Sequence, residues 1–284
     1  MMKPCSSTDE DTSKELIASY LDQLLGFGQT APVATRVIPV SVIEKFADTY
    51  EKKSLLKETA SKCALEGGYF LGPMIGWWDS LIPVRTMRKY KEDIDTLEDI
   101  RRPFLSQNLY QAQMMSKYHT FYMLVNILRH GKDEFITREG DLVSLDLDRS
   151  RFKTTAPLRA SDINYTWCYV CYMDKWVYDT FQAIGPNQPA DFKLGALMKE
   201  MLSHEDLFNN LFDSRLGVAL DQRVSMLLEC VDQCIQQYGR DNVILDQTRA
   251  LSNREIVEWF VRNSEYKKQN GKEGPSDLEF LQDL

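Results

Sequence analysis

The feature that most constrains the fold of this 284-residue chain is a helical pattern that runs into a polar motif and then into a short hairpin pattern. Apolar residues recur near helical spacing from Leu109 to Leu128, and Asn126-Ile127-Leu128-Arg129-His130 closes that run. Residues 135–147 then alternate around a turn and include Leu145-Asp146. This order predicts a mainly α-helical domain with short β-hairpins.

Other elements are expected from the same kinds of pattern. Ser13 can cap a first helix that ends near Gly26, and Gly239 supplies a stop for the clearest helix of the chain. The further elements that we expect are an extended segment at 31–42, a surface helix or loop at 44–65, buried strand and turn at 69–84, a packed aromatic helix at 165–181, and helices at 191–202 and 220–238.

Composition argues against two classes of protein. The net charge of -8 argues against a nucleic-acid binder, because such binders neutralise phosphates with Lys and Arg. No window approaches eighteen uninterrupted apolar residues, so we expect no membrane span. The first residues, MMKPCSSTDEDTSKE, show no apolar signal-peptide core.

Six cysteines leave the compartment open. Cys168 and Cys171 form a C-x2-C pattern, and Cys230 and Cys234 a C-x3-C pattern, so a zinc site and disulfides are both alternatives. Buried free thiols are the favoured interpretation, because one pair lies in an aromatic run and the other on an amphipathic helix. Asn164-Tyr165-Thr166 is a glycosylation sequon, which would make the chain a glycoprotein if it is secreted.

The segment 121–152 resembles the catalytic core of the secretory-pathway kinases called family with sequence similarity 20, which includes the Golgi casein kinase and the glycosaminoglycan xylosylkinase. Their first motif resembles Asn-x-Asp-Arg-His and their second Leu-Asp-Asn-Gly-x-x-Phe. In this chain Leu128 occupies the position of the catalytic aspartate, followed by the motif remnant Arg129 and His130. Asp146 matches the metal-binding aspartate.

Further segments carry the resemblance in the family's order. They are Glu15 to Phe27 with Pro32 and Arg36, Glu66-Gly67, Ala156-Pro157-Leu158, Leu220-Asp221-Gln222-Arg223, and Cys234 to Gly239. The resemblance implies an atypical kinase-like C-lobe over residues 13–250, flanked by a disordered acidic N-terminus at 1–12 and a polar C-terminal extension at 251–284. It implies that the N-lobe is largely absent, because only fourteen residues precede Glu15, which matches the regulatory-helix glutamate.

The resemblance also implies a set of site residues. Asp146 would bind Mn²⁺ or Mg²⁺ together with ATP, and oxygen ligands suit these cations. Without the resemblance, Asp146 would be an outward-facing strand residue and Asp133 a loop aspartate. The implied nucleotide-binding residues are Phe70, Leu71, Gly72 and Pro73 at the adenine-facing hinge, together with Asp133 and Asp146.

The resulting hypothesis is a catalytically impaired pseudokinase, because Leu128 cannot accept the proton of an attacking hydroxyl. It would reside in the Golgi lumen or be secreted, and it would bind a related active kinase or a secreted protein or glycan substrate. One alternative is an active Golgi protein or glycan kinase whose N-lobe is missing from this gene model. The other is a helical interaction domain with no nucleotide site.

Overall fold

The structure is a computed structural model. It describes residues 9–47, 64–65, 68–76, 81–83, 109–126, 134–136, 142–145, 147, 150–152, 171, 173–204 and 212–246. The helices are α1 (Asp9–Leu25), α2 (Val40–Ala47), α5 (Leu109–Val125), α7 (Lys175–Ala183), α8 (Leu194–Ser203), α9 (Ser214–Tyr238) and α10 (Arg240–Val243), with a 3₁₀ turn at Ala190–Phe192. The strands are β1 (Val33–Pro39), β2 (Ala64–Leu65), β3 (Tyr69–Ile75), β4 (Ile82–Pro83), β5 (Glu134–Ile136), β6 (Leu142–Ser144), β7 (Met173–Asp174) and β8 (Ile244–Leu245).

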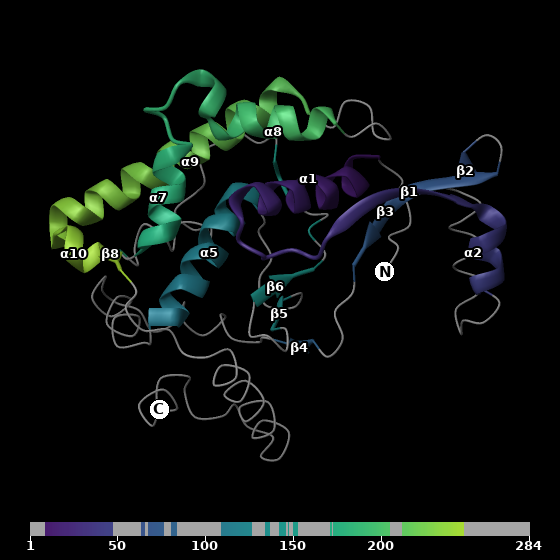
Figure 1. Cartoon of the computed structure of the whole chain (residues 1–284), viewed down its shortest axis with the longest axis horizontal. Helices are drawn as coiled ribbons and strands as arrows, with labels where there is room; N and C mark the ends of the chain where they lie inside the picture. Colours follow the sequence, from purple (N-terminus) through teal and green to yellow (C-terminus); the bar gives the residue numbers. More distant parts are fainter. Residues whose placement is uncertain are drawn as a thin grey trace, which may run out of the picture.

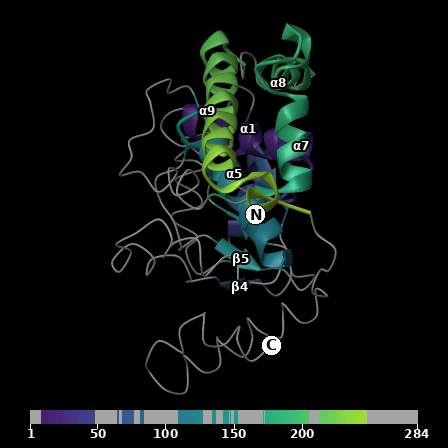
Figure 2. The ribbon, with the colours of Figure 1, turned by 90° about the vertical axis from the view of Figure 1, so that its left-hand side faces the viewer.

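The described part of the chain is mainly helical, as expected, and its helices gather in one body (Figure 1). The long helix α9 packs against α8, α5 and α7, and Figure 2 shows it standing beside α7. Fully buried side chains from several helices and from neighbouring segments form a shared core that excludes water. The largest are Tyr118, Phe121, Phe181, Leu16, Leu21, Leu124, Leu147, Met173 and Leu194.

The strands form three small sheets. The first has the order β1-β3-β2 and is antiparallel, with Val33 opposite Ile75 and Pro39 opposite Tyr69. The second has the order β4-β5-β6, and its β5–β6 hairpin confirms the hairpin expected from the alternating sequence. The third pairs β7 with β8 in parallel. In Figure 1 the first sheet and α2 extend to one side of the helical body.

Helix α1 contacts α8 as well as β1 and β3. Consequently its side chains are buried on more than the one apolar stripe that the sequence suggested. It also begins at Asp9, four residues before the expected cap at Ser13 and inside the segment 1–12 that was predicted to be disordered. Disorder of the N-terminal segment stays a prediction.

Two helix starts differ from expectation, and aspartate side chains explain both. Within the helix predicted at 165–181, helix α7 begins at Lys175, because Asp174 caps it by accepting from the N–H groups of Trp176 and Val177. Residues 165–170 of that prediction lie outside the described part. Helix α9 begins at Ser214 rather than at Leu220, because Asp213 accepts from the N–H of Leu216 at 2.9 Å.

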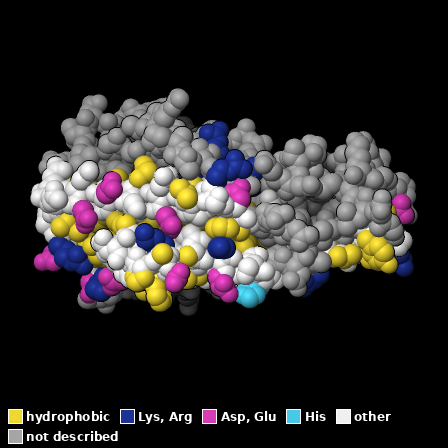
Figure 3. Space-filling view, turned by 90° about the horizontal axis from the view of Figure 1, so that it is seen from above, with side chains coloured by type: hydrophobic (Ala, Val, Ile, Leu, Met, Phe, Trp, Pro, Cys, Tyr) yellow, Lys and Arg dark blue, Asp and Glu magenta, His cyan; other side chains and the backbone are white. Residues whose placement is uncertain are grey.

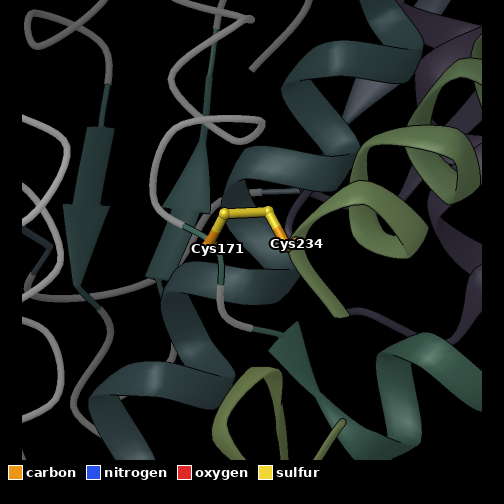
Figure 4. The surroundings of a disulfide bond; sticks show 2 residues. All are labelled: Cys171 and Cys234. Atoms are coloured by element: carbon orange, nitrogen blue, oxygen red, sulfur yellow. A yellow bond between two sulfur atoms is a disulfide. The ribbon is translucent and has the colours of Figure 1, made fainter. Parts of the chain in front are cut away.

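A disulfide joins Cys171, just before β7, to Cys234 on α9 (Figure 4). The Cα atoms are 5.2 Å apart, within the range that a disulfide needs, and both residues are buried. Cys230 is disulfide-bonded as well. The favoured expectation of buried free thiols is therefore wrong for these three cysteines. Spacing along the chain could not reveal the pairing, because the two partners are 63 residues apart.

The surface over the helical body mixes apolar, acidic and basic side chains (Figure 3). Apolar atoms also gather at the end of the molecule where β1 and α2 lie (Figure 3), and Val37 and Val42 are about half exposed there. Within the described residues, no helix has the length and apolar character needed to cross a membrane.

Candidate functional site

The end of α5 fixes the direction in which the chain leaves toward the polar motif. Asn126 follows the last helical residue with a φ of 49°, in the left-handed region, and its N–H donates to the carbonyl of Met123 at 3.3 Å. Asparagine tolerates this conformation better than most residues, which gives the first residue of the motif a structural reason. Asn126 is also buried, so this turn is part of the core.

The strand that leads to Asp146 is held from two sides at Ser144. Its backbone N–H donates to the carbonyl of Gln29 at 2.7 Å, and its hydroxyl accepts from the Tyr122 hydroxyl at 2.8 Å. Thr30 and Ser144 also form a parallel β-bridge. These contacts fix the end of β6 to α5 and to the loop that follows α1.

That loop is organised by Asp22 of α1. Its carboxylate accepts from the N–H of Gln29 at 3.0 Å, and from the N–H and hydroxyl of Thr30 at 2.8 and 2.9 Å. Burial raises the pKa of Asp22 above its ordinary value of 3.8, and these hydrogen bonds and the charge of Lys117 oppose that rise only in part. Asp22 therefore supports the Asp146 strand indirectly, through Gln29 and Ser144.

The raised pKa gives a prediction on stability and pH. Because the folded state holds the Asp22 proton more tightly than the unfolded state, the contribution of Asp22 to the free energy of unfolding should fall as pH rises from about 3.8 through the folded-state pKa. Asp22→Asn has no titration at this position. We therefore consider the free energy of unfolding of the wild type minus that of Asp22→Asn, measured by urea unfolding between pH 4 and 7. This difference should become smaller as the pH rises. The change is about 1.4 kcal/mol for every tenfold difference in proton affinity between the folded and unfolded states. A difference that grows with pH would contradict the assignment.

Arg223 of α9 joins two segments that are distant in sequence. Its guanidinium donates to the carbonyl of Leu124 near the end of α5, to that of Arg151 at 2.8 Å and to that of Phe152 at 3.0 Å. The N–H of Arg151 in turn donates to the carbonyl of Val125 at 3.0 Å. Arg223 is 3% exposed, and burial lowers its pKa to about 10, so the side chain stays charged at neutral pH.

The turn of α9 that carries Arg223 also stabilises the start of α8. Asp221 accepts from the N–H of Gly195 in the first turn of α8 at 2.7 Å. The N-cap residue Lys193 makes no side-chain cap of its own, so a carboxylate from α9 stabilises this helix end. Within the motif Leu220-Asp221-Gln222-Arg223, Asp221 thus places a negative charge at the start of α8, and Arg223 places a positive charge at the end of α5.

The structure describes some of the predicted site residues and not others. Glu15 is buried on α1. Phe70, Leu71, Gly72 and Pro73 lie inside β3, where they pair with residues 35–38 of β1. Their role in nucleotide binding stays a prediction. Five predicted site residues lie outside the described part: Leu128, Arg129, His130, Asp133 and Asp146.

The described residues contain no group of three or more His, Cys, Asp or Glu side chains that could hold a metal ion. The predicted metal ligand Asp146 is not among them, although its neighbours Leu145 and Leu147 are. The expectation of Mn²⁺ or Mg²⁺ stays a prediction.

Sequence reasoning used Arg223 only as a motif match and missed what it contacts. One signal was available: Arg223 interrupts the apolar stripe of α9 between Leu220 and Leu227. An arginine at a buried position must find acceptors, because burying an unpaired charge is costly. Asp22 was likewise only part of the matched segment Glu15 to Phe27, and Ser144 gave no signal.

Comparison with known proteins gives matches among solved structures. No protein-family model and no curated protein sequence matches the chain. The structure of hydra Fam20 with sugar is similar at a TM-score of 0.61 and 18% identity, over 84% of this chain and 75% of that chain. Two structures of the Golgi casein kinase, one with Mn and ADP bound, are similar at a TM-score of 0.56 and 13% identity, over 82% of this chain. The chain has the fold of the Fam20 secretory-pathway kinases.

The Fam20 fold confirms the kinase-like architecture that the motifs implied. The chain spans 63% and 64% of the two Golgi casein kinase chains that it matches. At these identities the likeness establishes the Fam20 fold alone.

Proposed function

We propose that this chain is a secretory-pathway kinase-like domain that has lost phosphotransfer and acts by binding a partner or substrate. The observation that carries the proposal is Leu128, at the motif position of a catalytic aspartate, in a chain with the Fam20 fold. In protein kinases that aspartate accepts the proton of the attacking hydroxyl. A leucine has no acceptor atom, and loss of such a group costs about 10²- to 10⁴-fold in rate.

Disulfides support the proposed compartment. Cys171, Cys230 and Cys234 are all disulfide-bonded. Disulfides persist in oxidising compartments and are rare in the cytosol of most organisms. This favours the Golgi lumen or secretion for the chain, in agreement with the Golgi casein kinase as a structural neighbour.

The proposed partners are a related active kinase or a secreted protein or glycan substrate. The neighbours' names motivate both substrate classes, since one is a casein kinase and the other was solved with sugar. The proposed ligand is ATP with Mn²⁺ or Mg²⁺, with Asp146 as the metal ligand. The Golgi casein kinase was solved with Mn and ADP, which motivates this choice for the chain.

The decisive experiment measures phosphate transfer from radiolabelled ATP with Mn²⁺ to casein and to a glycan acceptor. We expect transfer by the wild-type chain to equal that of Asp146→Ala. We expect Leu128→Asp to exceed wild type by about 10²-fold, because the variant regains a proton acceptor. Leu128→Ala is the matched control and should stay at the wild-type level.

Two results would replace the proposal by its alternatives. Wild-type transfer that is lost in Asp146→Ala would identify an active kinase with a substitute base. A melting temperature that does not change with Mn²⁺ and ATP, in both wild type and Leu128→Asp, would favour a helical interaction domain without a nucleotide site, because a ligand that binds the native state raises its stability.

A further inference from the structure

One buried cation connects the two segments that border the candidate site. The first segment is the end of α5, where the chain turns at Asn126 toward Leu128. The second is residues 150–152, which follow Asp146 along the chain. Arg223 donates to Leu124 in the first segment and to Arg151 and Phe152 in the second.

We infer that Arg223 is a positioning residue, which holds the segment leading to Leu128 and the segment following Asp146 in one fixed arrangement. Its relevance to nucleotide and metal binding rests on the proposed function. The coupling between the two segments rests on the contacts of Arg223 alone. Arg223 itself would touch neither substrate nor cofactor, and would act through the backbone of these segments.

Arginine suits this task for two physical reasons. Its planar guanidinium carries five N–H donors in a fixed fork, so one side chain can serve acceptors on two segments at once. The last carbonyls of α5 also have no partner within the helix, and the negative end of the helix dipole lies there. A cation therefore stabilises the end of α5 where the chain leaves it, while its remaining donors hold residues 151 and 152.

Backbone N–H groups near Arg223 can report on this coupling through their rates of hydrogen exchange. The N–H of Arg151 donates to the carbonyl of Val125, across the two segments, and the N–H of Asn126 donates within the turn after α5. The N–H of Gly195 donates to Asp221, two residues before Arg223 on the same helix. It therefore reports on α9 and α8 without reporting on the segments near the candidate site.

The experiment is amide hydrogen exchange on the wild-type chain, Arg223→Lys, Arg223→Met and the control Asp221→Asn. In both Arg223 variants we expect exchange to rise together at Arg151 and Asn126, by about ten- to hundredfold, since hydrogen bonds from a charged group are lost. The Gly195 amide should keep its wild-type rate. Asp221→Asn should give the reverse pattern, with faster exchange at Gly195 only.

If Arg223→Met does not fold, Arg223→Lys alone tests the coupling. Lysine keeps the positive charge but presents a single ammonium group instead of the guanidinium fork that reaches both segments. Wild-type exchange at both reporters in Arg223→Lys would overturn the inference. So would a uniform rise across the chain, which would indicate general destabilisation.

A titration with Mn²⁺ and ATP tests the link to the candidate site. Arg223→Lys should bind about tenfold more weakly than both wild type and Asp221→Asn, and equal binding would overturn the positioning role. If wild type shows no binding, the proposed nucleotide site is wrong, and the exchange pattern still decides whether Arg223 couples the two segments.

Discussion

Replacing Cys171 and Cys234 by alanine is expected to lower the free energy of unfolding by about 4 kcal/mol. The disulfide closes a loop between residues 63 positions apart, and opening a loop of this size restores that much conformational entropy to the unfolded chain. Both cysteines are buried in the main core, so the effect should reach the whole helical body. Denaturant unfolding under non-reducing conditions measures the loss.

The two single variants provide the control for this prediction. Either substitution alone breaks the same bond, so Cys171→Ala, Cys234→Ala and the double variant should all lose nearly the same stability. Strongly non-additive losses are the signature of groups that act as one unit. Small losses that add in the double variant would show that the two positions act as independent thiols. Mass spectrometry after alkylation checks that Cys230 keeps its own disulfide in every variant.

The sequence predicted those parts of the fold that local pattern determines. The helical period identified α5 and α9, and Gly239 ends α9 as expected, with a φ of 83° that glycine adopts freely. Helix starts were predicted less well. Asp174 and Asp213 cap α7 and α9, but a single aspartate among many polar residues does not distinguish a cap from an ordinary surface position.

The contacts that frame the candidate site could not be predicted, for a different reason. Arg223 and Asp22 bind backbone groups, which every residue carries, so the sequence leaves no trace of which carbonyl or N–H is the partner. The disulfide pairing also depends on the tertiary fold. The motif residues themselves, such as Leu128 and Asp146, lie outside the described part, so their roles remain predictions from resemblance.

Replacing Gly195 by alanine is expected to lower the free energy of unfolding by about 3 kcal/mol. A Cβ at this position would lie 2.6 Å from the carbonyl oxygen of Gly217 and 2.8 Å from its Cα. Both are backbone atoms of α9, so relief requires α8 and α9 to move apart rather than one side chain to rotate. Such a shift would also lengthen the hydrogen bond from Gly195 to Asp221.

Gly217 provides a matched control on the facing helix. A Cβ at Gly217 would approach the end of the Phe212 ring at 2.8 Å, and the ring is partly exposed and can rotate away. Alanine also favours a helix over glycine by up to about 1 kcal/mol, which offsets part of the remaining strain. Gly217→Ala should therefore cost less than about 1 kcal/mol in the same denaturant experiment. Equal losses in the two variants would show that α8 and α9 do not pack through a backbone contact at Gly195.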